Sequence, residues 1–173
     1  LNQSILDNAM KTISSNLKRQ VKKELITQSQ MNHSFDNITT STNMKSLRNA
    51  FIVIEAASED EIIKTNIFKN LDTICEPQTI LATNTSSISI TKIANATSRK
   101  DKVIGMHFMN PVPIMKLIEV IKGKDTSEQT LETILKISKK LNKIALECND
   151  SPGFISNRIL MPLINEAAYC LMD

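Results

Sequence analysis

From residue 51 onward, short apolar runs alternate with stretches in which apolar residues recur every three or four positions. The runs favour β-strands, and an unbroken apolar run such as residues 51–54 is typical of a strand buried on both faces of a parallel sheet. The spaced stretches favour amphipathic helices that cover such a sheet. The predicted strands are residues 51–54, 79–83, 103–107, 115–121 and 144–148, and the predicted helices are residues 60–75, 88–97 and 126–142. This alternation predicts an α/β fold built on a doubly wound sheet.

The two ends of the chain differ from this pattern. Residues 4–28 carry one apolar stripe among lysines and arginines, which predicts a helix. The polar stretch 29–43 contains one short β-branched strand candidate at 38–41. After Pro152 and Gly153, a long helix is predicted to run to the end of the chain, and it is too apolar to lie on the surface of the α/β domain. We therefore expect an α/β domain over residues 1–150 and the start of a second, helical domain over residues 151–173.

Composition excludes several classes of function. The chain has 173 residues, 41% of them apolar, and a net charge of +3. No basic stripe interleaved with aromatic residues is present, which argues against nucleic acid as a partner, while a mild basic excess suits an anionic small ligand. No apolar run approaches membrane-spanning length, and no signal peptide is recognisable, so we expect no membrane association. The three cysteines are widely spaced and lie far from both histidines, so we expect reduced thiols, no metal site and a cytoplasmic location.

A histidine ends one predicted strand, and a glutamate lies within the next. His107 follows the apolar residues 103–106, and Glu119 lies between Ile118 and Val120. The carboxyl edge of an open α/β sheet faces the ligand crevice. A carboxylate in an apolar strand is costly without a partner, and an imidazole whose tautomer it fixes becomes a general base. The alternative is a structural histidine with a glutamate that points to solvent.

Three further polar clusters follow predicted strands or open a helix. Residues 84–87 (Asn-Thr-Ser-Ser) offer hydroxyls to a substrate oxygen or a cofactor, or else form an ordinary turn and helix cap. Residues 55–59 place small side chains between two glutamates, which permits close ligand approach or marks a plain strand-to-helix turn. Asn157 faces inward after Pro152 and Gly153, as a ligand contact or as a buried amide bonded to backbone.

Taken together, these segments resemble the L-3-hydroxyacyl-CoA dehydrogenase family, and most of all its short monofunctional members that act on substrates such as 3-hydroxybutyryl-CoA. The most specific feature is the His-Phe-x-Asn-Pro block that begins at His107, with a glutamate twelve residues later. The stretches that carry the resemblance are residues 54–59, 82–91, 105–121 and 150–160. The resemblance implies a Rossmann-type domain that binds NAD, an acyl-CoA substrate, and oxidation of a 3-hydroxyl to a 3-oxo group.

The resemblance also implies roles for individual residues. His107 is the expected base that takes the hydroxyl proton, Glu119 orients it, Ser86 bonds the reacting oxygen, and Asn157 helps to hold substrate and base. The residues expected to contact the cofactor are Glu59, Lys64, Ser86 and Asn84. Lys23 matches a lysine that contacts CoA, and Asn16 stands where the family has a serine in such a contact.

The chain departs from the family at both ends. The family begins with a strand and a Gly-x-Gly-x-x-Gly loop that holds the pyrophosphate, whereas the first glycine here is Gly105. The family's helical C-terminal domain, through which the full-length protein is expected to dimerise, is represented by its first helix alone. Because the chain starts at Leu1 and ends inside an apolar stretch, we expect a fragment. We expect it not to turn over substrate by itself, because no glycine before residue 105 can hold the pyrophosphate, and we expect its last helix, without a partner domain, to expose an apolar face. The alternative from another class is a relative that keeps the fold without catalysis.

Overall fold

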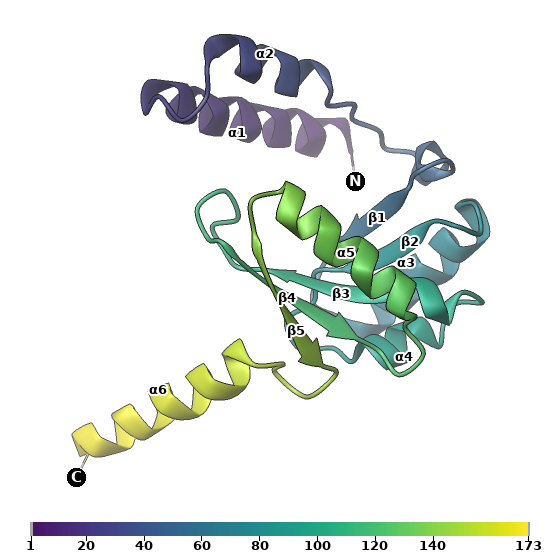
Figure 1. The fold of residues 1–173 in the computed structure, drawn as a ribbon, viewed down its shortest axis with the longest axis vertical. Coiled ribbons are helices and arrows are strands. Elements are labelled where there is room, and N and C mark those ends of the chain that lie inside the picture. Colours follow the sequence, from purple (N-terminus) through teal and green to yellow (C-terminus); the bar gives the residue numbers. More distant parts are fainter. Residues whose placement is uncertain (1, 173) are drawn as a thin grey trace. The chain divides into compact units, whose positions relative to one another are not determined.

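The structure is a computed structural model, and it describes residues 2–172. The chain divides into two compact units, residues 1–46 and residues 47–173. The first unit contains two helices, α1 (Gln3–Lys22) and α2 (Gln28–Asp36), and a short 3-10 helix, Met44–Leu47, follows them in the chain. The second unit contains a five-stranded sheet with its covering helices, followed by α6 (Ser156–Met172) (Figure 1).

The first unit differs from the prediction in two places. The first helix ends at Lys22 rather than at residue 28, and Glu24 just beyond it adopts a left-handed backbone with a φ of 56°. A capping box then starts α2, because the Thr27 hydroxyl accepts from the Gln30 amide while the Gln30 side chain accepts from the Thr27 amide. The strand candidate at 38–41 was wrong, since these residues form no strand.

The sheet has the strand order β1-β2-β3-β4-β5. Strands β1, β2 and β3 are parallel, β4 runs antiparallel to β3, and β5 is parallel to β4. The strands span β1 (Ile52–Glu55), β2 (Ile80–Thr83), β3 (Val103–Phe108), β4 (Leu117–Lys122) and β5 (Ile144–Asn149). All five predicted strands are present, and the turn around Pro111 and Pro113 folds β4 back beside β3.

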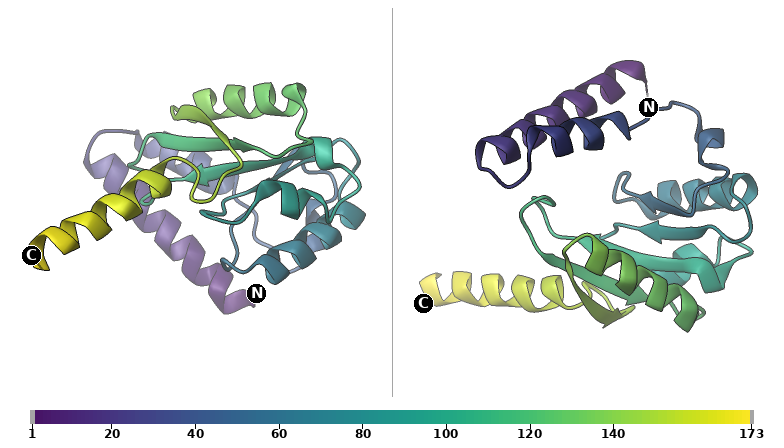
Figure 2. Two further views of the ribbon diagram at one scale, coloured as in Figure 1. Left: turned by 90° about the horizontal axis from the view of Figure 1, so that it is seen from below. Right: turned by 45° about the horizontal axis from the view of Figure 1, so that its top comes forward.

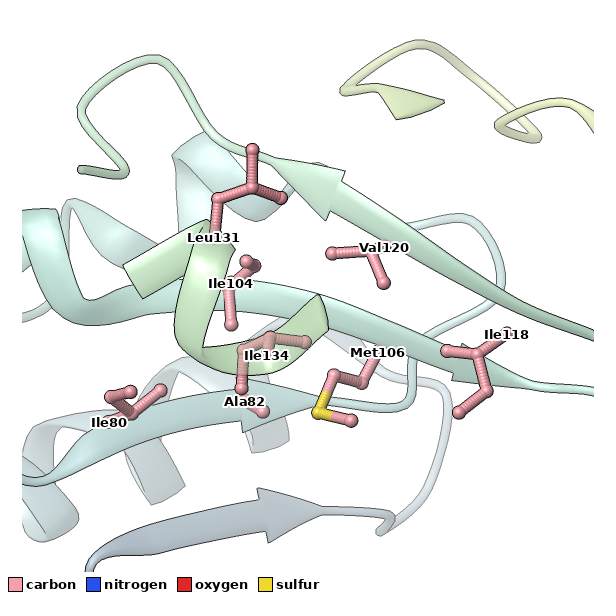
Figure 3. Close-up of a cluster of buried hydrophobic side chains, with 8 residues drawn as sticks. All are labelled: Ile80, Ala82, Ile104, Met106, Ile118, Val120, Leu131 and Ile134. Carbon is pink, nitrogen blue, oxygen red and sulfur yellow. The ribbon is translucent and has the colours of Figure 1, made fainter. Parts of the chain in front are cut away.

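Helices cover both faces of the sheet, as the doubly wound pattern predicted. Helix α5 (Glu128–Lys140) lies on one face, and α3 (Glu61–Ile74) and α4 (Ile90–Ala94) lie on the other (Figure 2). The core beneath α5 is entirely aliphatic apart from one methionine (Figure 3). Its buried members are Ile80, Ala82, Ile104, Met106, Ile118, Val120, Leu131 and Ile134. Because side chains alternate along a strand, the odd-numbered residues of β3 and β4 face α3 and α4.

Burial on both faces, expected for the run at 51–54, holds for one face only. Val53 is buried on the face that α3 and α4 cover, whereas Ile54, on the face of α5, is 41% exposed. Strand β1 is an edge strand of the sheet in the described residues, and α5 packs against β3, β4 and β5 instead of β1. Helix α6 also exposes its apolar residues, as expected from its composition, with Ile159 and Leu163 each 63% exposed. Within residues 2–172, no helix has both the length and the apolar character needed to cross a membrane.

One glycine is required by close packing. A Cβ atom on Gly105 would lie 2.9 Å from Cβ of Ile121 and 2.9 Å from Cδ1 of Ile90, closer than side chains approach. At Gly123, an added Cβ would lie no closer than 3.3 Å to any neighbour. The absence of a side chain at Gly105 therefore lets Ile90 of α4 pack directly onto β3.

We expect Gly105→Ala to lower the free energy of unfolding by about 1–3 kcal/mol, the usual cost of overpacking a core. Gly123→Ala is the matched control and should cost clearly less. Urea unfolding followed by circular dichroism measures both. Equal stability of the Gly105→Ala chain and the unsubstituted chain would contradict this description of the α4 contact.

Candidate active site

His107 and Glu119 form a buried pair across two strands. They are directly opposite partners in the antiparallel register of β3 and β4. Nδ1 of His107 lies 2.8 Å from Oε2 of Glu119, which confirms the predicted contact. Glu119 is fully buried, and His107 is 9% exposed. The carboxylate fixes the proton on Nδ1, so that Nε2, which bonds to none of residues 2–172, is left with a lone pair.

The second carboxylate oxygen of Glu119 is held by the start of α6. Oε1 accepts hydrogen bonds from the Ile155 amide at 3.1 Å, the Ser156 amide at 2.7 Å and the Ser156 hydroxyl at 3.0 Å. Burial alone would raise the pKa of Glu119, but the hydrogen bonds from His107, Ser156 and Ile155 outweigh it and hold the pKa below its ordinary value. Glu119 is therefore an anion at neutral pH, in spite of its burial.

The segment before α6 encloses the imidazole. Gly153 and Phe154 both adopt positive φ angles, of 73° and 51°, which reverses the chain sharply. This turn places the buried Phe154 ring against His107, with ring centroids 5.9 Å apart. An aromatic wall limits the contact of the His107 ring with water on that side. The sharp turn that the sequence predicted at Pro152-Gly153 therefore places an aromatic ring against the candidate base.

Ser86 lies in a loop whose hydroxyls and amides donate hydrogen bonds to one carboxylate. Oε1 of Glu59 accepts from the Thr85 hydroxyl, from the amides of Ser86 and Ser87, and from their hydroxyls at 3.2 and 3.0 Å. Although partial burial raises the pKa of Glu59, these bonds and the nearby Lys64 ammonium lower it to about 2. The loop after β2 is thus built around a permanent negative charge.

Two asparagines brace the same loop and its neighbour. Nδ2 of Asn157 donates to the Ser86 carbonyl at 3.3 Å, and Oδ1 of Asn84 accepts from the Phe108 amide at 2.8 Å. Asn157 therefore reaches Ser86 from α6, and Asn84 ties the end of β2 to the end of β3. The structure thus pairs His107 with Glu119 and Asn157 with Ser86, and Ser156 beside Asn157 bonds Glu119, while the catalytic roles of these residues stay predictions.

Lys64 is buried beneath this loop. Its Nζ lies 2.8 and 3.0 Å from the two carboxylate oxygens of Glu55 and 3.6 Å from Oε2 of Glu59, and the residue is 1% exposed. Glu55 also accepts from the Thr83 hydroxyl at 2.7 Å. Lys64 and Glu59 were predicted to contact the cofactor, whereas no role was predicted for Glu55, although its place at the end of an apolar strand was an available signal.

Asp150 was also passed over as an organising residue. It accepts from the Ser89 hydroxyl at 2.8 Å and from the amides of Ile90 and Thr91, each at 2.9 Å. The residue after β5 therefore holds the first turn of α4, which follows the Ser86 loop. Ser156 was missed too, because nothing in its sequence context distinguishes a hydroxyl that meets a carboxylate 37 residues away.

The remaining predicted residues lie in the first unit. Asn16 is half-buried on α1, where its Oδ1 accepts from the Arg19 guanidinium, and Lys23 is exposed at the end of that helix. A contact of either with CoA stays a prediction. In residues 2–172, no three metal-binding side chains gather in a way that would hold a metal ion.

The fold and the site together define a Rossmann-type α/β domain that presents a histidine–glutamate pair at the carboxyl edge of its sheet. Residues 1–151 match the model of the family described as 3-hydroxyacyl-CoA dehydrogenase, NAD binding domain. The chain therefore belongs to the 3-hydroxyacyl-CoA dehydrogenase family.

Individual relatives agree with this assignment. The whole chain is 46% identical to a probable 3-hydroxybutyryl-CoA dehydrogenase of Bacillus subtilis and covers 60% of that protein. It is 47% identical to a 3-hydroxybutyryl-CoA dehydrogenase of Clostridioides difficile, with 99% of the chain and 61% of the relative aligned. The chain thus spans about three fifths of the length of these curated relatives.

Solved structures show the same fold. The crystal structure of (S)-3-hydroxybutyryl-CoA dehydrogenase from Ralstonia eutropha is 44% identical, with a TM-score of 0.94 over 96% of this chain and 59% of that one. The crystal structure of 3-hydroxybutyryl-CoA dehydrogenase from Escherichia coli is 36% identical, with a TM-score of 0.96 over 99% of this chain and 36% of that one.

The low pKa of Glu59 predicts a pH dependence of stability. The pKa is about 2 in the folded chain and about 4.3 when unfolded, so the stabilisation is complete above the unfolded value and is lost as the pH falls through the folded one. We expect Glu59→Gln to destabilise the chain at pH 7 and to cost less at pH values below about 4.

Urea unfolding at neutral and at acidic pH measures this difference. Glu61→Gln is the matched control, because Glu61 is exposed and makes only a surface ion pair with Lys92. A difference between the Glu59→Gln chain and the unsubstituted chain that does not change with pH would show that Glu59 does not hold the loop through its charge.

Proposed function

We propose that the protein to which this chain belongs oxidises (S)-3-hydroxyacyl-CoA to 3-oxoacyl-CoA with NAD⁺, in a reversible reaction. The observation that carries the proposal is the buried contact between His107 Nδ1 and Glu119 Oε2, which leaves Nε2 as a base at the carboxyl edge of the sheet. The names of the similar proteins, which are 3-hydroxybutyryl-CoA dehydrogenases, support a short acyl chain as substrate.

His107 would do the proton chemistry. Nε2 takes the proton of the 3-hydroxyl group, and the imidazolium that forms is stabilised by the anionic Glu119 on its other nitrogen. With NAD⁺ bound to take the hydrogen on the same carbon as a hydride, loss of the hydroxyl proton to His107 would turn the C–O single bond into a carbonyl. In the reverse direction the imidazolium returns the proton to the oxygen.

Ser86 and Asn157 would orient the reacting oxygen. The Ser86 hydroxyl donates to Glu59 here; with substrate bound it would donate instead to the 3-oxygen, whose own proton is then directed to Nε2 of His107. Asn157 holds the Ser86 carbonyl and so fixes the loop relative to the base. A fixed geometry lowers the entropy loss on reaching the transition state.

The residues after β1 and β2 fit an NAD cofactor, whose nicotinamide ring accepts the hydride when bound. Residues 56–58 (Ala-Ala-Ser) are small and exposed, so a ligand can approach the backbone there. Glu55 neutralises Lys64, and Glu59 then leaves one net negative charge that suits a cationic nicotinamide. Because Lys64 is buried, we propose that Glu59 contacts the cofactor directly and that Lys64 acts through it, with Asn84 bracing the loop.

Further parts of the proposal rest on the family. Lys23 and Asn16 on α1 would contact the CoA moiety, and the full-length protein would form a homodimer through a helical domain that α6 begins. We also propose a cytoplasmic location.

We expect His107→Gln to lower kcat by about 10²–10⁴-fold with little change in KM for the acyl-CoA, as for loss of a positioned general base. Glu119→Gln should lower kcat as well, because a neutral amide cannot stabilise the imidazolium. The measurement is oxidation of NADH by acetoacetyl-CoA in the complete protein that carries this chain.

The chain offers a matched control, since its only other histidine, His33, is exposed on α2. His33→Gln should leave kcat unchanged. A His107→Gln protein that keeps more than about half of its activity would place the base elsewhere. Absence of turnover in the unsubstituted complete protein would instead favour the non-catalytic alternative.

A further inference from the structure

The carboxylate of Glu119 stands at the beginning of a helix that lies far from it in sequence. Ser156 is the first residue of α6, and the amides of Ile155 and Ser156 both point at Oε1. Unpaired amides at a helix start favour an anion, and here the anion comes from a strand of the sheet. Glu119 thus bonds both the start of α6 and the imidazole of His107.

The two oxygens of this carboxylate have separate partners. Oε2 lies 2.8 Å from Nδ1 of His107, while Oε1 accepts three hydrogen bonds from the start of α6. Rotation of the carboxylate would break all four contacts, so Oε2 is kept on Nδ1. Of the three donors to Oε1, the Ser156 hydroxyl is the only side-chain group, and it can be removed without altering the backbone.

We propose that Ser156 is a positioning residue, whose hydroxyl withdraws negative charge from Glu119 and thereby sets how strongly the carboxylate holds a proton on His107. The proposal rests on the proposed function, in which His107 is the base. It goes beyond orientation alone, because it assigns to one hydroxyl the tuning of that base.

Few other ionisable groups face Glu119. His107 approaches from β3, and Cys148 approaches from β5 as a neutral thiol, because burial and the nearby Glu119 raise the pKa of Cys148 to about 11. Glu147 of β5 and Arg158 of α6 lie farther out, where they line an open pocket together with Cys148. Neither forms a hydrogen bond or an ion pair with Glu119 in the described residues, so apart from His107 and the Cys148 thiol, Ser156 is the residue whose side chain acts on this carboxylate.

The sign of the effect follows from charge. A hydrogen bond to a carboxylate disperses its negative charge, and its loss makes the carboxylate a stronger acceptor. Without the Ser156 hydroxyl, Glu119 should bind the imidazolium form of His107 more tightly. The titration midpoint of His107 should therefore move to higher pH, and the acidic limb of the kcat/KM profile should move with it.

The first test needs no turnover. The ring protons of His33 and His107 are followed by NMR as a function of pH in this 173-residue chain, with the exposed His33 as internal reference. In Ser156→Ala we expect the His107 midpoint to rise by about half a pH unit, a modest effect for one charge-assisted hydrogen bond, and the His33 midpoint to stay. Ser156→Thr keeps a hydroxyl and should restore the His107 midpoint.

A matched control removes a serine hydroxyl elsewhere in the fold. Ser138 on α5 is fully buried, and its Oγ lacks a hydrogen-bond partner in the described residues. Ser138→Ala should leave both midpoints unchanged. An unchanged or lowered His107 midpoint in Ser156→Ala, or a Ser156→Thr chain that behaves like Ser156→Ala, would overturn the proposal.

The second test uses the complete protein. In Ser156→Ala the acidic limb of kcat/KM should shift to higher pH by the same amount as the NMR midpoint, with little change in KM at the plateau. A purely structural role would change stability or KM and leave the limb in place. If the NMR midpoint moves but the protein shows no turnover at any pH, the role of Ser156 stands and the proposed function fails. If turnover is normal and neither quantity moves, the proposed function stands and the role of Ser156 fails.

Discussion

The constraint on which the rest of the site depends is a negative charge buried in the middle of a sheet. An unpaired carboxylate there would cost several kcal/mol, and Glu119 is fully buried on β4. The fold meets this cost from two directions, with the imidazole of β3 on one oxygen and the start of α6 on the other. The antiparallel return from β3 to β4 is what makes the first contact possible, because it places His107 and Glu119 opposite each other.

Carboxylates organise the loops around the site in the same way. Glu59 accepts hydrogen bonds from the hydroxyls and amides of residues 85–87, and Asp150 accepts them from the first turn of α4. Glu55 forms an ion pair with Lys64 and neutralises its charge. Each of them accepts hydrogen bonds at a point where a strand or helix ends and backbone amides lack partners. The loops at the carboxyl edge are therefore fixed by charge-assisted hydrogen bonds, which allows them to stay polar and open to a ligand.

The sequence predicted the five strands because continuous apolar runs indicate buried strands, and it predicted the His107–Glu119 contact because an isolated carboxylate in such a run needs a partner. Helix α2 was missed, since its stability comes from a local capping box within a polar segment. The one-sided burial of β1 could not be read from residues 51–54, because it depends on where α5 lies. Ser156, Asp150 and Glu55 were missed for a related reason: their partners are distant in sequence, and the side-chain types alone do not reveal them.

The hydrogen bonds of Glu119 also hold the start of α6, which is half-buried, whereas its later residues expose large apolar side chains. Three of the four bonds to this carboxylate come from Ile155 and Ser156. If the first turn of α6 moved away, those bonds would be lost and a buried charge would remain with His107 alone, which is unfavourable. The start of α6 is therefore tied to the sheet through Glu119, independently of what packs on the rest of the helix. Any movement of the start of α6 would consequently also change how strongly Glu119 holds a proton on the candidate base.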